Sequence, residues 1–326
     1  MYGVSLLQPQ LEHPPDRAVC PVRGCRVSVP WEPGPVPSAG DRRCPLHRIF
    51  LSRTTFRYGR ETDNLLWTGP QDLALLGAAR KGTGERSFGL DSSPGAVTWN
   101  AFRWLEATGG LALLLEEWLG ETVLETAVAY WGYGSRNLEL LPNLRRARIA
   151  FAEPESDETR FPVCIETSGH FVVVAPRLGP ICTGDEEPGR KRWEPERESD
   201  WLGEVLMPHW RELLDMRLAG ALVRIWALGS YAAKLRGLDF VLLDISPRWA
   251  NGSAGESLAG ALRIAEGRRV AKANWEDVYD FAGDSPHPDA DVIRAYLREK
   301  SAGYSPDGRL RRAFSPEVAR TVTRVS

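Results

Sequence analysis

The chain has 326 residues, of which 43% are hydrophobic and 26% are charged, and its formal net charge at pH 7 is −2. These values are those of a globular protein with a full hydrophobic core. They exclude a low-complexity chain and a uniformly basic nucleic-acid-binding protein of the histone type. Residues 1–10 lack the basic and apolar regions of a secretory signal, and no apolar run reaches the length of a membrane span. We therefore expect a soluble, cytoplasmic protein that has no membrane partner.

Two pairs of metal-binding residues lie near the N-terminus. Cys20 and Cys25 form a C-x4-C pair, and Cys44 and His47 form a C-x2-H pair after a spacer of eighteen residues. Each pair spans a short turn, so three thiolates and one imidazole can converge as the closed tetrahedral shell of a structural zinc ion. Three clustered cysteines among five favour a metal site in a reducing compartment over a disulfide framework. The alternative is two free thiols and a surface histidine.

Helix signals dominate the segment after residue 90. Ser93 is a residue type that caps helix N-termini, and Pro94 suits the first helical position. Apolar residues then recur at helical spacing up to Gly109–Gly110, which stops the helix. A second helix is predicted for residues 111–119.

Three strand-like segments come next. Arg148–Phe151 shows the alternation that predicts a strand. Val163–Ile165 and Phe171–Val174 are rich in β-branched and apolar residues, and Ser168–Gly169 between them is a turn signal. These two runs therefore predict a β-hairpin.

Helical and apolar segments alternate in the last third of the chain. Trp201–Arg236 predicts a long helical region with a break near Pro208. Leu238–Ile245 is a largely apolar segment of the kind found in a buried strand. Asn274–Asp277 has a capping-box-like pattern that begins another helix, and Asp291–Arg298 predicts one more. The predicted fold class is α/β, with a core order of helix, three strands, helix, strand.

This order is also that of the PD-(D/E)XK nuclease core, the restriction-endonuclease-like fold. The chain resembles a bacterial family that joins an N-terminal zinc ribbon to a PD-(D/E)XK domain. The similar stretches keep one order over most of the chain and are Cys44–His47, Asp63–Trp67, Ala96–Arg103, Ile165–Thr167, Gly237–Phe240 and Trp275–Tyr279. The resemblance implies a zinc-ribbon module in residues 1–60 and a PD-(D/E)XK-like α/β domain with C-terminal helices in residues 61–326.

The resemblance also implies where a Mg²⁺-dependent nuclease would carry its catalytic residues. The family's metal-binding Asp and Glu positions fall on Pro162 and Ala175, and its helical acid position falls on Pro94. Proline and alanine offer no side-chain oxygen to a hard divalent cation. The family's lysine position falls on Arg177, which keeps the charge but is too basic to act as a general base. The sequence therefore favours a nuclease-like protein without catalytic residues.

A protein with this fold but without the catalytic acids could still bind nucleic acid. Arg190, Lys191 and Arg192 form a basic run beside an aromatic residue, a pattern that can track phosphates and stack a base. Arg177 is expected where the substrate phosphate passes in the family. We therefore predict a protein that binds nucleic acid or serves as a subunit of a nucleic-acid-processing or defence complex, with a partner protein or a second copy of itself.

Two alternatives stay open. The first is an active Mg²⁺-dependent nuclease whose acids have moved, with Glu166 and Asp185 as the candidates. The second is a protein-interaction module that has no role with nucleic acid. Asp239 and Asp244, which bracket the late apolar run, are expected to serve as a helix cap or as surface acids.

Overall fold

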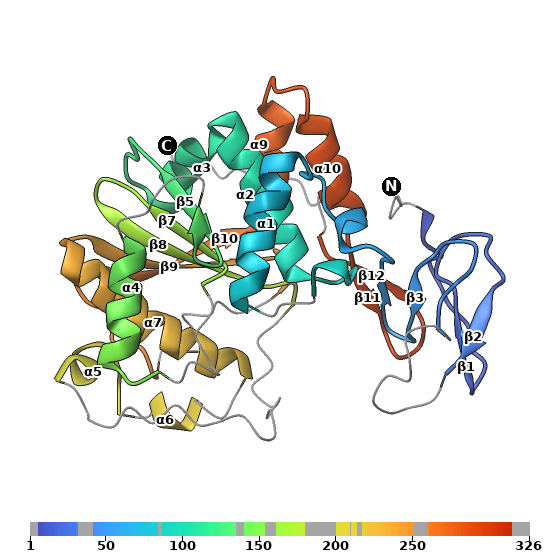
Figure 1. Ribbon diagram of the computed structural model, residues 1–326, viewed down its shortest axis with the longest axis horizontal. Helices are drawn as coiled ribbons and strands as arrows, with labels where there is room; N and C mark the ends of the chain where they lie inside the picture. The colour runs from blue at the N-terminus through green and yellow to red at the C-terminus, as the bar shows by residue number, and fades with distance from the viewer. Residues whose placement is uncertain are drawn as a thin grey trace, which may run out of the picture.

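A mixed sheet between two layers of helices forms the body of the protein, and a small module made from the N-terminal residues lies beside it (Figure 1). The sheet has six strands in the order β10-β9-β8-β7-β5-β6. This computed structural model describes residues 6–31, 42–83, 87–134, 140–153, 161–179, 200–208, 210–213, 217–250, 258 and 260–314. The prediction of a mixed α/β protein is confirmed.

The sheet combines an antiparallel half with a parallel half. Its strands are β5 (Ala127–Tyr130), β6 (Tyr133–Gly134), β7 (Val163–Glu166), β8 (His170–Pro176), β9 (Asp239–Ser246) and β10 (Arg268–Asn274). Strands β6, β5, β7 and β8 pair antiparallel, whereas β8, β9 and β10 run parallel. The predicted hairpin is confirmed as β7 and β8, and its turn is closed by the His170 N–H, which donates to Thr167 Oγ1 at 2.8 Å. The predicted late strand is confirmed as β9.

One predicted strand is wrong. Arg148–Phe151 is the last turn and end of helix α4 (Leu140–Ala150), and the first of the three strands is β5 instead. Leu144, Ala147 and Phe151 recur at helical spacing and are buried against the layer that contains α7 (Arg217–Arg236). The helical spacing of buried residues extends over the eleven residues of α4, whereas the alternation extends over only four, so the segment forms a helix.

Five helices among the described residues cover one face of the sheet. They are α1 (Pro70–Thr83), α2 (Pro94–Thr108), α3 (Gly110–Leu119), α9 (Trp275–Asp284) and α10 (Ala290–Glu299). Helix α2 begins as predicted, because Ser93 Oγ accepts a hydrogen bond from the Ala96 N–H at 3.1 Å. Helix α9 begins with the Asn274 N–H donating to Asp277 Oδ2 at 2.9 Å. No helix in the described part of the chain combines the length and apolar character needed to cross a bilayer.

The other face is covered by α4, α5 (Asp200–Val205), α6 (Trp210–Leu213) and α7, and α4 and α7 lie next to each other there (Figure 1). The predicted break near Pro208 is confirmed, since α5 ends at Val205 and α6 begins at Trp210. The described part of residues 201–236 forms the three helices α5, α6 and α7. The aromatic side chains of Trp226 and Phe240 meet edge to face, with ring centroids 5.5 Å apart. This contact fixes α7 on the parallel half of the sheet.

A glycine permits this close contact. A Cβ at Gly229 would meet Phe240 Cζ at 2.7 Å. We expect Gly229→Ala to lower the free energy of unfolding by about 1–3 kcal/mol, because an overpacked core displaces the ring. Gly203 lies in helix α5, and a Cβ added there would meet nothing within 4 Å, so Gly203→Ala should raise that free energy by up to about 1 kcal/mol through helix propensity. Urea unfolding of both variants measures the difference, and equal signs would contradict the packing argument.

The N-terminal module has its own small core. Its strands are β1 (Arg17–Val19), β2 (Ser28–Pro30), β3 (Phe50–Leu51) and β4 (Phe56–Arg57), which form two antiparallel pairs. The buried side chains include Leu7, Ala18, Val29, Ile49, Leu51, Phe56 and Tyr58 together with the three module cysteines.

A hairpin from the far end of the sequence docks on this module. Strands β11 (Ser301–Tyr304) and β12 (Leu310–Arg312) pair antiparallel. The Tyr304 N–H donates to Thr54 O at 2.6 Å, and the Leu310 N–H donates to Pro9 O at 2.9 Å. Backbone hydrogen bonds therefore join residues 1–60 to the rest of the chain across the predicted boundary at residue 60.

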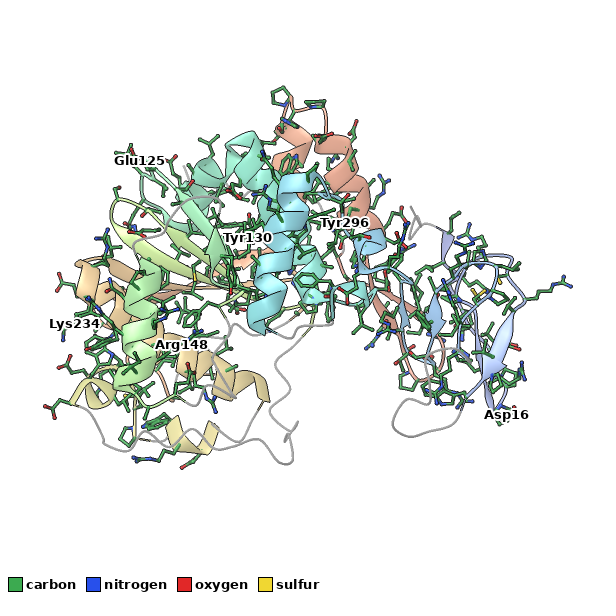
Figure 2. The ribbon with its side chains drawn as sticks, in the orientation of Figure 1. Asp16, Glu125, Tyr130, Arg148, Lys234 and Tyr296 are labelled. Carbon is green, nitrogen blue, oxygen red and sulfur yellow. The ribbon has the colours of Figure 1, made fainter. Side chains whose placement is uncertain are left out.

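A buried polar network lies beside this junction. Lys300 and Asp91 are fully enclosed, with Lys300 Nζ 3.5 Å from Asp91 Oδ1. Lys300 Nζ also donates to Asn64 Oδ1 at 2.8 Å, and Ser301 Oγ donates to Asp91 Oδ2. Tyr296 on α10, labelled in Figure 2, places its ring 5.1 Å from the same ammonium. Partnered charges of this kind fix the position of the hairpin relative to the α/β domain.

Candidate functional site

The four predicted metal-binding residues converge in the N-terminal module. One ligand atom from each of Cys20, Cys25, Cys44 and His47 lies within 4.8 Å of the other three. The three cysteines are buried and the imidazole is half-buried. The described residues contain no other such group of three or more cysteine, histidine and acidic side chains.

Two turns aim these side chains at one point. The first turn connects β1 to β2, and Gly24 within it adopts a left-handed conformation with φ of 79°. It is closed by the Cys20 N–H, which donates to Val27 O at 2.9 Å. The second turn is closed by the Cys44 N–H, which donates to Ile49 O at 2.9 Å. Gln8 Nε2 also donates to Cys20 O at 2.9 Å and so holds the first turn from outside.

The spacing of the ligand atoms fits a tetrahedral ion. Zn–S bonds of about 2.3 Å and Zn–N bonds of about 2.0 Å set S–N separations of about 3.5 Å and S–S separations of about 3.8 Å. His47 Nδ1 lies 3.4 Å from Cys20 Sγ and 3.6 Å from Cys44 Sγ. Cys25 Sγ lies 3.9 Å from Cys44 Sγ. The group can therefore hold a metal ion through all four side chains.

The electrostatics of the cluster also favour a bound cation. Burial raises the pKa of the Cys20 thiol, and the neighbouring cysteines raise it further because like charges repel. A divalent ion between the sulfur atoms reverses this effect, since it stabilises the thiolate form directly. Four protein ligands fill a tetrahedral shell and leave no position for a substrate, which is the arrangement of a structural site.

The predicted nuclease positions lie at the ends of β7 and β8. Pro162 directly precedes β7, one residue beyond the Val163–Val174 pair, and Ala175 is buried in β8. Ala175 pairs with Asp244 of β9, so an acid lies on the neighbouring strand at the same level as Ala175. Pro94 begins α2, which packs on the opposite face of the sheet from Ala175.

Arg177 occupies the carboxyl edge of β8 as the partner of this acid. Its Nε and Nη2 atoms donate to the two oxygens of Asp244 at 2.7 and 2.8 Å, and Nη1 donates to Gly179 O at 3.0 Å. Arg177 is only 3% exposed and Asp244 is 0% exposed. Asp244 is therefore not a surface acid, and the Arg177 guanidinium is enclosed in a bidentate ion pair instead of facing an open surface.

The other acids considered from the sequence are placed differently. Glu166 Oε1 lies 3.0 Å from Arg236 Nη2 on α7, away from the carboxyl edge of β8. Asp239 is the first residue of β9 and lines a pocket with Arg268 and Arg269 at the amino end of the parallel strands. Asp185 and the basic run Arg190, Lys191 and Arg192 lie outside the described residues.

Sequence reasoning missed a second polar cluster at the carboxyl edge of the parallel strands. Arg248 follows β9 and pairs with Asp277 at 3.0 Å and Asp280 at 2.8 Å on α9. The Arg248 N–H also donates to Glu276 Oε2 at 3.0 Å. The capping-box pattern predicted that Asp277 lies in the first turn of α9. No sequence pattern predicted its ion pair with Arg248.

A scan against protein-family models and searches of curated proteins and of solved structures found no match to this chain. The membership suggested by the sequence resemblance therefore stays a prediction.

Proposed function

We propose that the N-terminal module is a zinc ribbon with a structural zinc ion, that the α/β domain is nuclease-like, and that the protein binds nucleic acid without cleaving it. Zinc is the ion that best fits three cysteines and one histidine in a closed tetrahedral shell.

The order and pairing of the elements support a restriction-endonuclease-like core. With β5 as the first strand, the elements α2, β5, β7, β8, α7 and β9 follow one another along the chain, and α3, β6, α4, α5 and α6 lie between them. The three strands pair antiparallel, and α7 connects β8 to the parallel strand β9. This is the order that the resemblance predicts.

The ion pair between Arg177 and Asp244 is the observation that carries the loss of catalysis. Asp244 is the acid beside Ala175, but both of its oxygens accept hydrogen bonds from the Arg177 guanidinium. A Mg²⁺ ion needs carboxylate oxygens that are open to it and to a water molecule. A carboxylate that is fully enclosed and already bound to a guanidinium meets neither condition.

A cleavage and binding assay tests this proposal. The zinc-loaded protein is incubated with supercoiled plasmid and single-stranded circular DNA in Mg²⁺ and in Mn²⁺, with Glu166→Gln as the matched variant. We expect no cleavage by either protein. Binding to a short labelled duplex should be salt-dependent, with a Kd on the order of 10⁻⁴–10⁻⁶ M near physiological salt.

Two outcomes would overturn the proposal in different directions. Metal-dependent cleavage that Glu166→Gln abolishes would establish an active nuclease with relocated acids. Absence of affinity for any nucleic acid at low salt, together with salt-insensitive binding to a protein, would establish a protein-interaction module.

A further inference from the structure

The N-terminal module has a charge opposite in sign to that of the whole chain. Residues 1–60 contain nine arginines, no lysine and four acidic residues, a net charge of +5, whereas the whole chain carries −2. A bound zinc ion with three thiolates adds only a single negative charge. The module therefore stays strongly positive when it is loaded with metal.

Several described arginines of the α/β domain form ion pairs with neighbouring acids. Arg103 lies 2.6 Å from Asp72, and Arg269 lies 2.6 Å from Glu121. Arg177, Arg236 and Arg248 have the carboxylate partners described above. These guanidinium groups serve the fold and contribute little positive potential at the surface.

Five described arginines of the module are not paired in this way. Within the described parts of the chain, no carboxylate lies within 4.0 Å of the side-chain nitrogens of Arg23, Arg26, Arg43, Arg48 and Arg57. The first four side chains are exposed and Arg57 is half-buried. Positive groups without local acids attract polyanions instead of stabilising the fold.

These arginines flank the metal-binding turns. Arg26 directly follows Cys25, and Arg48 directly follows His47. Arg43 directly precedes Cys44. The same ion that fixes the two turns therefore fixes the backbone from which these guanidinium groups extend.

The ring of Phe50 contacts two of these arginines, Arg43 and Arg57, and limits their movement. Phe50 pairs with Arg43 on one side and with Arg57 on the other, so the three residues form one row across neighbouring strands. The guanidinium carbons of Arg43 and Arg57 lie 5.6 and 4.8 Å from the centre of the Phe50 ring. Arg43 Nε also donates to Arg48 O at 3.4 Å. Guanidinium groups that are held in place lose less conformational entropy when they bind a phosphate.

We propose that this arginine surface, formed by Arg23, Arg26, Arg43, Arg48 and Arg57, binds the phosphodiester backbone of nucleic acid. Forked N–H donors match the oxygens of a phosphate, and two of these arginines are held against one phenylalanine ring. The surface reads charge and not base sequence. This inference rests on the proposed function and assigns its main contact to the module.

Fluorescence anisotropy with the full-length, zinc-loaded protein tests the assignment. The probes are a random DNA duplex, the RNA duplex of the same sequence and the single strands, each measured over a range of salt concentrations. Arg43→Glu/Arg57→Glu removes the ordered row, and Arg23→Glu/Arg26→Glu changes exposed side chains of the first turn. Arg145→Glu/Arg146→Glu on α4 is the control, since it makes the same change in charge at exposed positions of the α/β domain.

We expect each module variant to weaken binding at least about tenfold for every probe that wild type binds, and to lower the slope of log affinity against log salt by about two. The control should retain wild-type affinity within about twofold, because it leaves the module contacts in place. Zinc content and melting temperature establish that the variants are folded, and the second module variant serves if the first is not. The preferred probe distinguishes DNA from RNA.

The results that would contradict this inference distinguish a failure of the arginine surface from a failure of the proposed function. If wild type binds nucleic acid and both folded module variants bind equally well, the arginine surface is refuted while the proposed function stands. If only Arg145→Glu/Arg146→Glu loses affinity, the contact lies on the α/β domain. If wild type binds no probe at low salt, the proposed function and this surface fail together.

Discussion

The Cys44→Ser variant is expected to lose the bound zinc ion and to unfold the N-terminal module. Cys44 Sγ lies near both Cys25 Sγ and His47 Nδ1, so its removal leaves the metal ion with only three protein ligands. Zinc binding in small structural sites is worth about 10–16 kcal/mol, and the module's core is small without it. We expect a chelator to have the same effect on the wild-type protein.

Zinc content per chain, measured by plasma mass spectrometry, and limited proteolysis of residues 1–60 check this result. Cys164→Ala is the matched control, because Cys164 is a buried cysteine of β7 outside the cluster. It should retain one zinc ion per chain although it leaves a small cavity. Equal zinc content in wild type and Cys44→Ser would show that this residue is not a ligand.

Replacement of Asp244 by alanine is expected to lower the free energy of unfolding by about 3–5 kcal/mol, because it leaves the Arg177 guanidinium buried without its anion. Arg177→Ala should have a similar effect for the converse reason. Arg177→Lys keeps the charge but replaces two fixed hydrogen bonds with a single flexible ammonium, so we expect an intermediate loss.

A double-mutant cycle separates the pair from its surroundings. Arg177→Met/Asp244→Leu removes both charges and fills the space with apolar atoms, so it should be markedly more stable than either single variant. Urea unfolding of wild type, Arg177→Ala, Asp244→Ala and Arg177→Ala/Asp244→Ala completes the cycle, and Arg177→Met/Asp244→Leu is measured beside these four proteins. If the destabilisation caused by the two single substitutions simply added up in Arg177→Ala/Asp244→Ala, the two side chains would not be coupled and their ion pair would not be a stabilising unit.

Local sequence signals predicted the elements whose pattern was complete within a few residues. Val163–Ile165 and Phe171–Val174 are almost entirely β-branched or apolar, and both became buried strands. The strand predicted for Arg148–Phe151 is wrong because four residues contain too little of the helical period that Leu144 and Ala147 complete. Strand β10 carries arginine and lysine and lies at the sheet edge, so it shows neither continuous apolar character nor clean alternation.

The candidate sites also differ in whether a short stretch of sequence predicts them. The cysteine and histidine pairs were predictable because each lies within a turn of a few residues. The pairing of Arg177 with Asp244 joins residues 67 positions apart. It depends on the register between β8 and β9, which only the folded sheet establishes. An arginine that looked like a phosphate ligand from the sequence is therefore part of the core.

The docking of the β11–β12 hairpin on residues from the N-terminal module has a consequence for synthesis. The module leaves the ribosome long before Ser301–Arg312 is translated. The carbonyl groups of Pro9 and Thr54 therefore have no hydrogen bond from this hairpin until synthesis is nearly complete. Metal capture can occur early, since all four ligands are near the start of the chain, but the final position of the module is set last. A cut at residue 60 would accordingly leave two fragments with exposed backbone edges instead of two independent domains.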